Sequence, residues 1–253
     1  MYQPRFYRSW GRQSLIGWTV SYRETDLFIR SAQPHYDYSL SVIKQLRQCL
    51  DRYIAKDPSF YSSLTPVLVD AEAPDVIQQM ADCAQLAKVG PMAAVAGIVA
   101  QHLGLALLNK VDEVMVENGG DIFLATKYDC IIGLYAGDQS PFTGKVGLKI
   151  LADQTPIGIC TSAGTVGPSL SFGCADAVTV LSPSTPLADA VATASANRIK
   201  RAQDIDETIA WARSIPEVMG IVIIKDARIG LWGDIEIVKT NETKPPKSSD
   251  DPR

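Results

Sequence analysis

The sequence lacks the cysteine pairs that would build a disulfide framework or a structural zinc site. Its five cysteines are widely spaced, odd in number and without a CxxC pair. They are Cys49, Cys83, Cys130, Cys160 and Cys174. We therefore expect free, mostly buried thiols. A reactive thiol at Cys160, in the segment IGICTSAG, is the alternative, but no basic neighbour in sequence would lower its pKa.

Clustered positive charge and a long apolar run are also missing. The formal charge is −4 and the sequence pI is near 5.2, with no face-sized group of Lys and Arg, which excludes the electrostatic pattern of a nucleic-acid binder. We expect no apolar run to reach the roughly 18 residues that span a bilayer. The start MYQPRFYRSWGRQ has no apolar core of a secretion signal. These absences predict a cytoplasmic protein with a small-molecule ligand and no membrane or nucleic-acid partner.

Three common catalytic motifs are absent as well. There is no GxGxxG after a strand, no HExxH and no GxSxG, which argues against the commonest dinucleotide, zinc-protease and hydrolase sites. The segment GDQSPFTGKV is superficially similar to a phosphate loop. However, the spacing from Gly137 to Gly144 is too long, and Val146 stands where Ser or Thr is needed to hold magnesium.

The composition that remains is that of an ordinary globular protein, with 46% hydrophobic and 21% charged residues. Apolar residues at three- and four-residue steps predict helices over 38–55 and 75–87. The run PMAAVAGIVAQHLGLALLNK is small and apolar on nearly every side, which predicts a buried central helix with close backbone contacts. Within it, His102 is expected to be a structural residue, with a ligand or base role as the alternative.

The second half of the chain has the texture of strands separated by Gly, Asn, Asp and Pro turns. An antiparallel meander is predicted over 113–117, 122–126, 130–135, 146–151, 157–161 and 177–181. Thr185 as N-cap and Pro186 in the first turn predict a further helix. The runs 218–224 and 229–238 predict a closing hairpin of the same sheet. We expect a single α+β domain over 1–240, with antiparallel sheets flanked by helices, and a disordered tail over 241–253.

The first candidate site segment is Asn118-Gly119-Gly120-Asp121, between two predicted strands. Its glycines permit positive φ, so backbone amides could approach an anionic or heterocyclic ligand closely. A simple hairpin turn explains the same residues. The tripeptide Gly120-Asp121-Ile122 recurs as Gly233-Asp234-Ile235, which we interpret as two turns that use a Gly-Asp pair rather than a duplication.

Two further segments are rich in oxygen donors and acceptors. The run from Thr161 to Ser169 is small and hydroxyl-bearing and could wrap phosphates, although a plain connecting loop has the same composition. Asp189 and Thr193 are four residues apart and so share one helical face. With phosphate oxygens of a ligand they would suit magnesium. The alternative for Asp189 is that it complements the helix dipole.

The order of these segments resembles the ApbE family of flavin transferases. A small-residue helix with Ala93-Ala94-Val95-Ala96-Gly97 is followed by ENGGDIF, ICTSAG and LADAVATA, over about residues 88–200. The resemblance implies an α+β fold, FAD and Mg²⁺ as ligands, and transfer of FMN to a Thr or Ser of an acceptor protein. The chain looks closest to the short cytoplasmic branch of the superfamily, whose members are associated with sulfide and homocysteine metabolism.

Carried over by motif, the resemblance makes Asp189 and Thr193 metal ligands, together with a main-chain carbonyl within 94–96. It places the nucleotide pocket at the following residues: Asn118, Gly119, Gly120, Asp121, Thr161 and Ser162. Two features depart from the family. Ala96 stands where a Lys is usual, and GPSLSFGCADAVTVL replaces a His-x-x-Asp-Pro-x-x-Gly segment. This replacement segment offers Ser169 and Ser171 as further cofactor-binding residues and Asp176 as a catalytic residue.

The leading hypothesis is an ApbE-like protein that binds FAD, FMN or another phosphorylated small molecule with Mg²⁺. Any catalysis would be FMN or phosphoryl transfer to an acceptor protein, with Asp176 or Asp121 as base. The departures favour a second hypothesis, a non-catalytic accessory or carrier protein in sulfide assimilation or homocysteine metabolism. A third is an α+β scaffold whose site lies elsewhere. A homodimer is the expected oligomeric state.

Overall fold

An eight-stranded antiparallel sheet forms the centre of a computed structural model that describes residues 15–164 and 173–240. Its strand order is β1-β2-β3-β4-β7-β8-β9-β10. The strands are β1 (Ile16–Tyr22), β2 (Thr25–Ser31), β3 (Val114–Asn118), β4 (Asp121–Ala125), β7 (Ile157–Ser162), β8 (Ala177–Ser182), β9 (Gly220–Lys225) and β10 (Arg228–Gly233). A second, three-stranded sheet has the order β11-β6-β5, formed by β5 (Cys130–Gly133), β6 (Val146–Ile150) and β11 (Glu236–Lys239).

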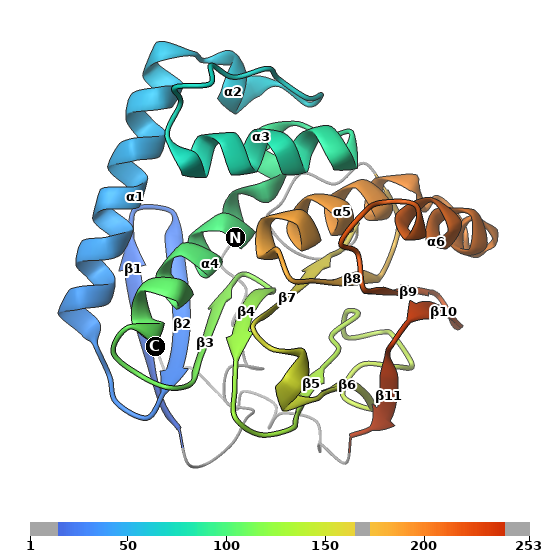
Figure 1. The fold of residues 1–253 in the computed structure, drawn as a ribbon. Coiled ribbons are helices and arrows are strands. Elements are labelled where there is room, and N and C mark those ends of the chain that lie inside the picture. The colour runs from blue at the N-terminus through green and yellow to red at the C-terminus, as the bar shows by residue number, and fades with distance from the viewer. Residues whose placement is uncertain (1–14, 165–172, 241–253) are drawn as a thin grey trace, which may run out of the picture.

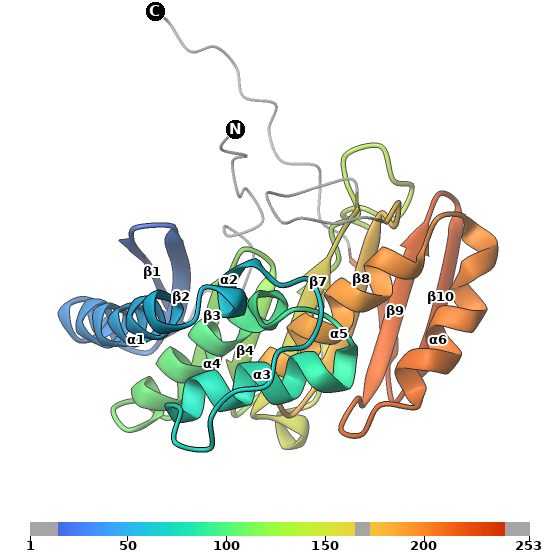
Figure 2. The same ribbon diagram turned by 90° about the horizontal axis from the view of Figure 1, so that it is seen from above.

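Helices cover the face of the central sheet that lies away from the small sheet (Figures 1 and 2). They are α1 (Tyr36–Lys56), α2 (Ser59–Ser62), α3 (Asp75–Ala87), α4 (Val95–Leu108), α5 (Thr185–Arg198) and α6 (Ile205–Arg213). Short 3₁₀ turns occupy Pro91–Ala94, Ala152–Gln154 and Ala202–Asp204. α4 packs on β3 and β4, α5 packs on β7 and β8, and α3 packs on α5. The fold therefore has helices, a large sheet and a small sheet as successive layers.

The two faces of the central sheet enclose two separate cores. One contains apolar residues of the helices and of the strand positions that face them, such as Leu46, Leu103 and Val180. The other lies between the two sheets and includes Leu124, Leu148 and Ile159. Because successive side chains of a strand point to opposite faces, central strands such as β4, β7, β8 and β9 contribute to both cores. The sequences of these strands are therefore nearly continuous apolar runs.

α5 is the helix most fully enclosed by the rest of the fold. Ser184 is its N-cap and accepts a hydrogen bond from the amide of Leu187, and Pro186 lies in the first turn. Its alanine-rich sequence leaves little side-chain volume, so α3, α4 and the sheet approach it closely. The predicted cap at Thr185 is therefore one residue late, because the Ser184 hydroxyl already performs that role.

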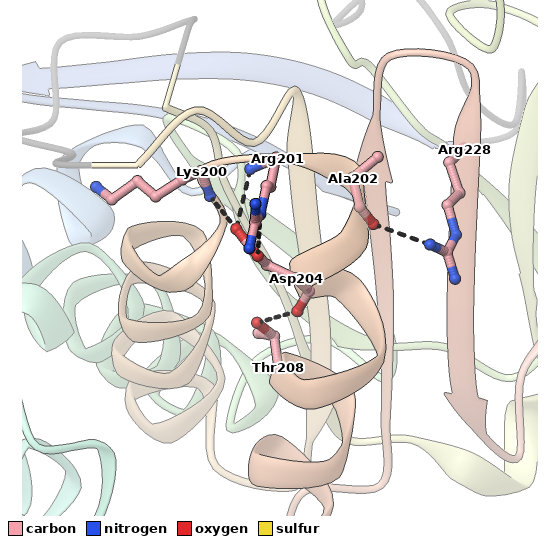
Figure 3. A network of polar contacts seen from close by, with 6 residues as sticks. All are labelled: Lys200, Arg201, Ala202, Asp204, Thr208 and Arg228. Atoms are coloured by element: carbon pink, nitrogen blue, oxygen red, sulfur yellow. Dashed lines mark hydrogen bonds and ion pairs between the residues drawn. The ribbon is translucent and has the colours of Figure 1, made fainter.

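The turn from α5 to α6 is built around Asp204 (Figure 3). Its carboxylate accepts the backbone amides of Lys200 and Arg201 at 2.9 and 3.0 Å, and its carbonyl accepts the Thr208 hydroxyl at 2.8 Å. The guanidinium of Arg228 on β10 donates to the Ala202 carbonyl at 3.2 Å. These bonds attach α6 to the β9–β10 end of the sheet.

The α+β fold class is confirmed, but three expectations about its elements are wrong. The predicted meander is interrupted, because β5 and β6 leave the central sheet and form the second one. The predicted closing strand 229–238 is two strands, β10 and β11, which belong to different sheets. Gly233, with φ of 107°, ends β10 where the chain changes sheets.

The third correction concerns the helix that follows Gly90. The stretch Pro91–Leu108 is 18 residues long and apolar enough to cross a membrane by composition, contrary to the expectation that no run reaches that length. Half of it is buried inside the fold, against the sheet and α5, as in a core helix. α4 is buried on one side only, since His102 and Leu105 are exposed. The predicted tail 241–253 lies outside the described residues.

Candidate functional site

Asp189 lies in the second turn of α5 and is 8% exposed. Its Oδ2 atom accepts the backbone amide of Gly97, at the N-terminus of α4, at 2.8 Å. Burial raises the pKa of this carboxyl to about 7, although the amides of Gly97 and Ala96 lower it in part by hydrogen bonding to the ionised form. The first turn of α4 therefore receives a carboxylate from a neighbouring helix.

Glycine at position 97 allows this contact. A Cβ atom there would lie 2.6 Å from the Thr185 carbonyl oxygen and 2.9 Å from both the Asp189 Cβ and the Pro186 Cα. Backbone and first side-chain atoms of α5 occupy that space, so a larger residue would force the helices apart. The glycine in AAVAG is thus explained by the packing of α4 against α5.

The β3–β4 hairpin reaches the same place from the sheet. Asn118 and Asp121 pair across it, and Gly119 and Gly120 form the loop with φ of 69° and 113°. The Asn118 side-chain amide donates to the Ala96 carbonyl at 3.1 Å. The first turn of α4 is therefore held at two points. Asn118 donates to its Ala96 carbonyl, and Asp189 accepts from its Gly97 amide. The hairpin, α4 and α5 meet there, although Asp121 and Asp189 are 68 residues apart in sequence.

Asp121 is the second buried carboxyl of this group and is also 8% exposed. Burial raises its pKa well above the ordinary value, and the negative charge of Asp189 raises it further; the Cys160 thiol and the Thr161 amide act in the opposite direction. Within residues 15–164 and 173–240, neither carboxyl forms an ion pair with Lys, Arg or His. We call Asn118, Asp121, Asp189 and the Ala96–Gly97 backbone the two-aspartate cluster.

Glu117 was not among the residues predicted from the sequence. It is 2% exposed, its Oε1 accepts the Gly120 amide at 3.0 Å, and its charge also raises the pKa of Asp121. It pairs with Ile122, which packs on the core between the sheets, so its side chain leaves the sheet on the face opposite Asp121. A charged residue inside the apolar strand before NGGD is the signal that could have found it.

The strand register places the two predicted hydroxyl residues of β7, Thr161 and Ser162, on opposite faces of the sheet. Cys160 pairs with Asp121 and lies on the helix face, so by alternation Ser162 shares that face and Thr161 does not. The Thr161 hydroxyl instead hydrogen-bonds that of Thr179 at 2.9 Å. Cys160 is fully buried and its Sγ donates to the Thr185 carbonyl at 3.4 Å. Burial, reinforced by the charge of Asp121, raises the pKa of this thiol well above the ordinary value, as expected for a structural cysteine.

The remaining predicted residues have different positions. Thr193 is one turn beyond Asp189 on α5 and is partly buried. Asp176 immediately precedes β8; its carboxylate accepts the Asp226 amide at 2.6 Å and lies 3.7 Å from the Lys225 ammonium. It is thus engaged by the β9–β10 turn rather than by the two-aspartate cluster. Ser169 and Ser171 lie outside the described residues.

In the described part of the chain, no group of three or more His, Cys, Asp or Glu side chains is arranged to hold a metal ion. A cation at the two-aspartate cluster would therefore need ligands from a bound molecule as well. A separate groove of about 770 Å³ lies between α1 and residues 70–74, with Gln48, Arg52, Lys56 and Glu72 in its lining. None of its lining residues belongs to the two-aspartate cluster.

Comparison with known proteins identifies the family. A family model described as "AbpE bacteria" matches residues 8–215. The chain belongs to this family. A UPF0280 protein from Methanocaldococcus jannaschii is 41% identical over 228 residues, which cover 87% of this chain and 92% of the relative. A UPF0280 protein from Methanocella arvoryzae is 40% identical and covers 83% of this chain and 86% of its own length.

Solved structures of ApbE proteins share the fold of this family member. The flavin transferase ApbE from Vibrio cholerae superimposes with a TM-score of 0.52 at 12% identity, covering 90% of this chain and 97% of that one. The apo form of the Pseudomonas stutzeri flavinyl transferase ApbE gives a TM-score of 0.54 at 13% identity, covering 90% and 94%. At these identities the likeness establishes the ApbE fold, and the site must be argued from its own residues.

Proposed function

We propose that the protein binds a flavin nucleotide, or another phosphorylated small molecule, together with Mg²⁺ at the two-aspartate cluster. The observation that supports this proposal is the burial of Asp121 and Asp189 within reach of each other's charge, without an ion pair to either in the described chain. Two buried like charges are costly unless a cation or a proton neutralises them. A divalent cation in this place would remove that cost.

The donor set of the cluster fits Mg²⁺. This ion takes hard oxygen ligands, usually one or two carboxylates, and completes its shell with waters and substrate phosphates. Asp189 would supply a carboxylate oxygen and Thr193, one turn further along the same helix, a hydroxyl. When bound, the ion would neutralise negative charge on the phosphates of the ligand.

The residues around the cluster would position the rest of the ligand. The positive-φ loop Gly119-Gly120 has no side chains, so a planar or phosphate-bearing group can approach its backbone closely. Ser162 lies on the same sheet face as Asp121, at the end of β7. For transfer of FMN to an acceptor hydroxyl, we assign the role of base to Asp121, since Asp176 is engaged by Asp226 and Lys225.

A non-catalytic flavin carrier is the second candidate function. Asp176, which replaces part of a family segment, is hydrogen-bonded into a turn, and Ala96 supplies no side-chain cation to a ligand. Neither residue therefore contributes an acid, base or charge to transfer. These observations favour binding without turnover, at the same two-aspartate cluster.

Flavin fluorescence tests the binding proposal. FAD should bind the wild-type protein in Mg²⁺ and be released by a chelator. Asp189→Asn should weaken binding about a hundredfold, because it removes the charge while its amide oxygen can still accept from Gly97. The control is Asp112→Asn, which changes an exposed carboxylate paired with Lys127 and should bind as the wild type does. Binding that ignores both Mg²⁺ and Asp189→Asn contradicts the proposal.

A turnover assay separates the two candidate functions. The protein is incubated with FAD, Mg²⁺ and a Thr-containing acceptor peptide, and the peptide mass is measured. A mass increase by FMN that is lost in Asp121→Asn supports transfer. Binding of FAD without any labelled peptide supports the carrier.

A further inference from the structure

A side chain from the second turn of each of α4 and α5 accepts a backbone amide from the first turn of the other helix. The amide of Thr185, the first residue of α5, donates to the side-chain Oε1 of Gln101 on α4 at 2.8 Å. In return, the amide of Gly97 in the first turn of α4 donates to Asp189 on α5 at 2.8 Å. Gly97 and Gln101 are one turn apart on α4, and Thr185 and Asp189 are one turn apart on α5. The helices are thus joined by two hydrogen bonds at one-turn spacing.

Thr185 is held firmly at this junction. It is 0% exposed, its carbonyl accepts the Cys160 thiol at 3.4 Å, and a Cβ at Gly158 on β7 would lie only 2.5 Å from its Cα. The amides of a helix's first turn have no intrahelical acceptor and must find one elsewhere. The Ser184 hydroxyl serves Leu187, so the Gln101 side chain is the acceptor that satisfies the Thr185 amide.

We propose that Gln101 is a positioning residue for the two-aspartate cluster. By holding the first turn of α5 it fixes the rotation of that helix, and so directs Asp189, one turn later, at the Gly97 amide and toward Asp121. Without the acceptor, a buried amide would be left unsatisfied, and the helix would shift to expose it to water. The effect on cation binding rests on the function proposed above; the effect on Asp189 does not.

The first experiment measures this positioning without any ligand. Gln101→Met keeps the length of the side chain and removes the amide oxygen, whereas Gln101→Glu restores an oxygen acceptor. Thr208→Val is the matched control, because it removes a buried 2.8 Å hydrogen bond at α6, away from the cluster. Amide hydrogen exchange at Gly97 is followed by NMR in each variant.

Gln101→Met should speed exchange of the Gly97 amide about tenfold relative to Leu107, at the other end of α4, by local opening of the α4–α5 contact. Gln101→Glu and Thr208→Val should leave that ratio at the wild-type value. An unchanged ratio in Gln101→Met overturns the proposal, and so does an equal rise in Gln101→Glu or Thr208→Val. Should Gln101→Met fail to fold, Gln101→Leu replaces it in the same comparison.

The second experiment titrates Mg²⁺ into each variant with FAD present. Gln101→Met should raise the apparent Kd for Mg²⁺ about tenfold, the effect typical of residues that orient metal ligands, and Gln101→Glu should restore tight binding. Wild-type affinity in a Gln101→Met protein whose Gly97 exchange is fast overturns the link to the cation site. If the wild-type protein itself binds no Mg²⁺ with FAD, the proposed function fails, while hydrogen exchange still decides the role of Gln101.

Discussion

The tripeptide Gly-Asp-Ile occurs at two places in the fold, and the two copies have similar backbones but different surroundings. Gly120 and Gly233 have φ of 113° and 107°, and both Ile122 and Ile235 pack on the core between the sheets. However, Asp121 is covered by α4 and α5 and is buried, whereas Asp234, between β10 and β11, is exposed. The local sequence thus determines the turn, and the helices that cover it determine whether its carboxylate can serve as a site.

Replacing each of the two glycines with alanine should give the largest difference in the free energy of unfolding. A Cβ at Gly233 would lie 2.2 Å from the Met219 carbonyl oxygen, whereas a Cβ at Gly120 would meet only the Thr161 carbonyl oxygen, at 3.4 Å. Gly120→Ala should therefore cost only backbone strain, about 2 kcal/mol. Gly233→Ala adds a backbone clash and should cost about 4 kcal/mol. Urea denaturation of both variants measures this; equal losses would contradict the packing around Gly233.

The two aspartates should differ in ligand binding. Asp121→Asn removes a charge from the two-aspartate cluster and should weaken Mg²⁺-dependent FAD binding about a hundredfold, equivalent to about 2.7 kcal/mol. Asp234→Asn should leave binding unchanged, because that side chain is exposed and outside the cluster. Fluorescence titration of the pair decides this. Similar losses in both variants would mean that Asp121 acts through the general charge of the protein.

The pH dependence of stability gives the smallest expected effect. The raised pKa of Asp189, about 7 in the folded protein, means that the folded state holds a proton that the unfolded state has lost. This contribution is fully present below the ordinary pKa of 3.8 and is lost as pH rises through about 7. Without Mg²⁺, thermal unfolding should therefore occur about 5 °C lower at pH 8 than at pH 5 as a result of this group.

Two variants sharpen that pH comparison. Asp189→Asn should reduce the dependence, since its amide does not titrate and only the raised pKa of Asp121 remains, and Asp234→Asn should retain it in full. Saturating Mg²⁺ with FAD should restore stability at pH 8 by binding the ionised folded form. A wild-type Tm that rises between pH 5 and pH 8, and rises equally in Asp189→Asn, contradicts the burial of an ionisable carboxyl at this position.

The sequence predicts the elements that build the cluster, because their signals are local. Asn-Gly-Gly-Asp specifies the β3–β4 hairpin, and Pro186 after a hydroxyl residue specifies the start of α5. Local signals of this type also predict the other strands and helices, and their combination predicts the α+β fold class. The predicted Asn118 and Asp189 are brought together by contacts with one turn of α4, and Asp121 pairs with Asn118 across the hairpin.

What the sequence does not predict depends on long-range pairing. β5 and β6 have the apolar texture of any strand, so nothing local shows that they form a separate sheet. Strand register decides that Thr161 faces Thr179 rather than the helices, and register cannot be read from a run of hydroxyl residues. The role of Gln101 cannot be predicted from the sequence for the same reason, because its hydrogen-bond partner Thr185 is 84 residues away.

The most direct test of the two-aspartate cluster is a crystal grown with FAD and Mn²⁺ in place of Mg²⁺, measured for anomalous scattering. One strong anomalous peak is expected about 2.1 Å from a carboxylate oxygen of Asp189, on the side of Asp121, with phosphate density beside it. Ordered FAD without a peak at that position, or a peak only in the groove between α1 and residues 70–74, would contradict it.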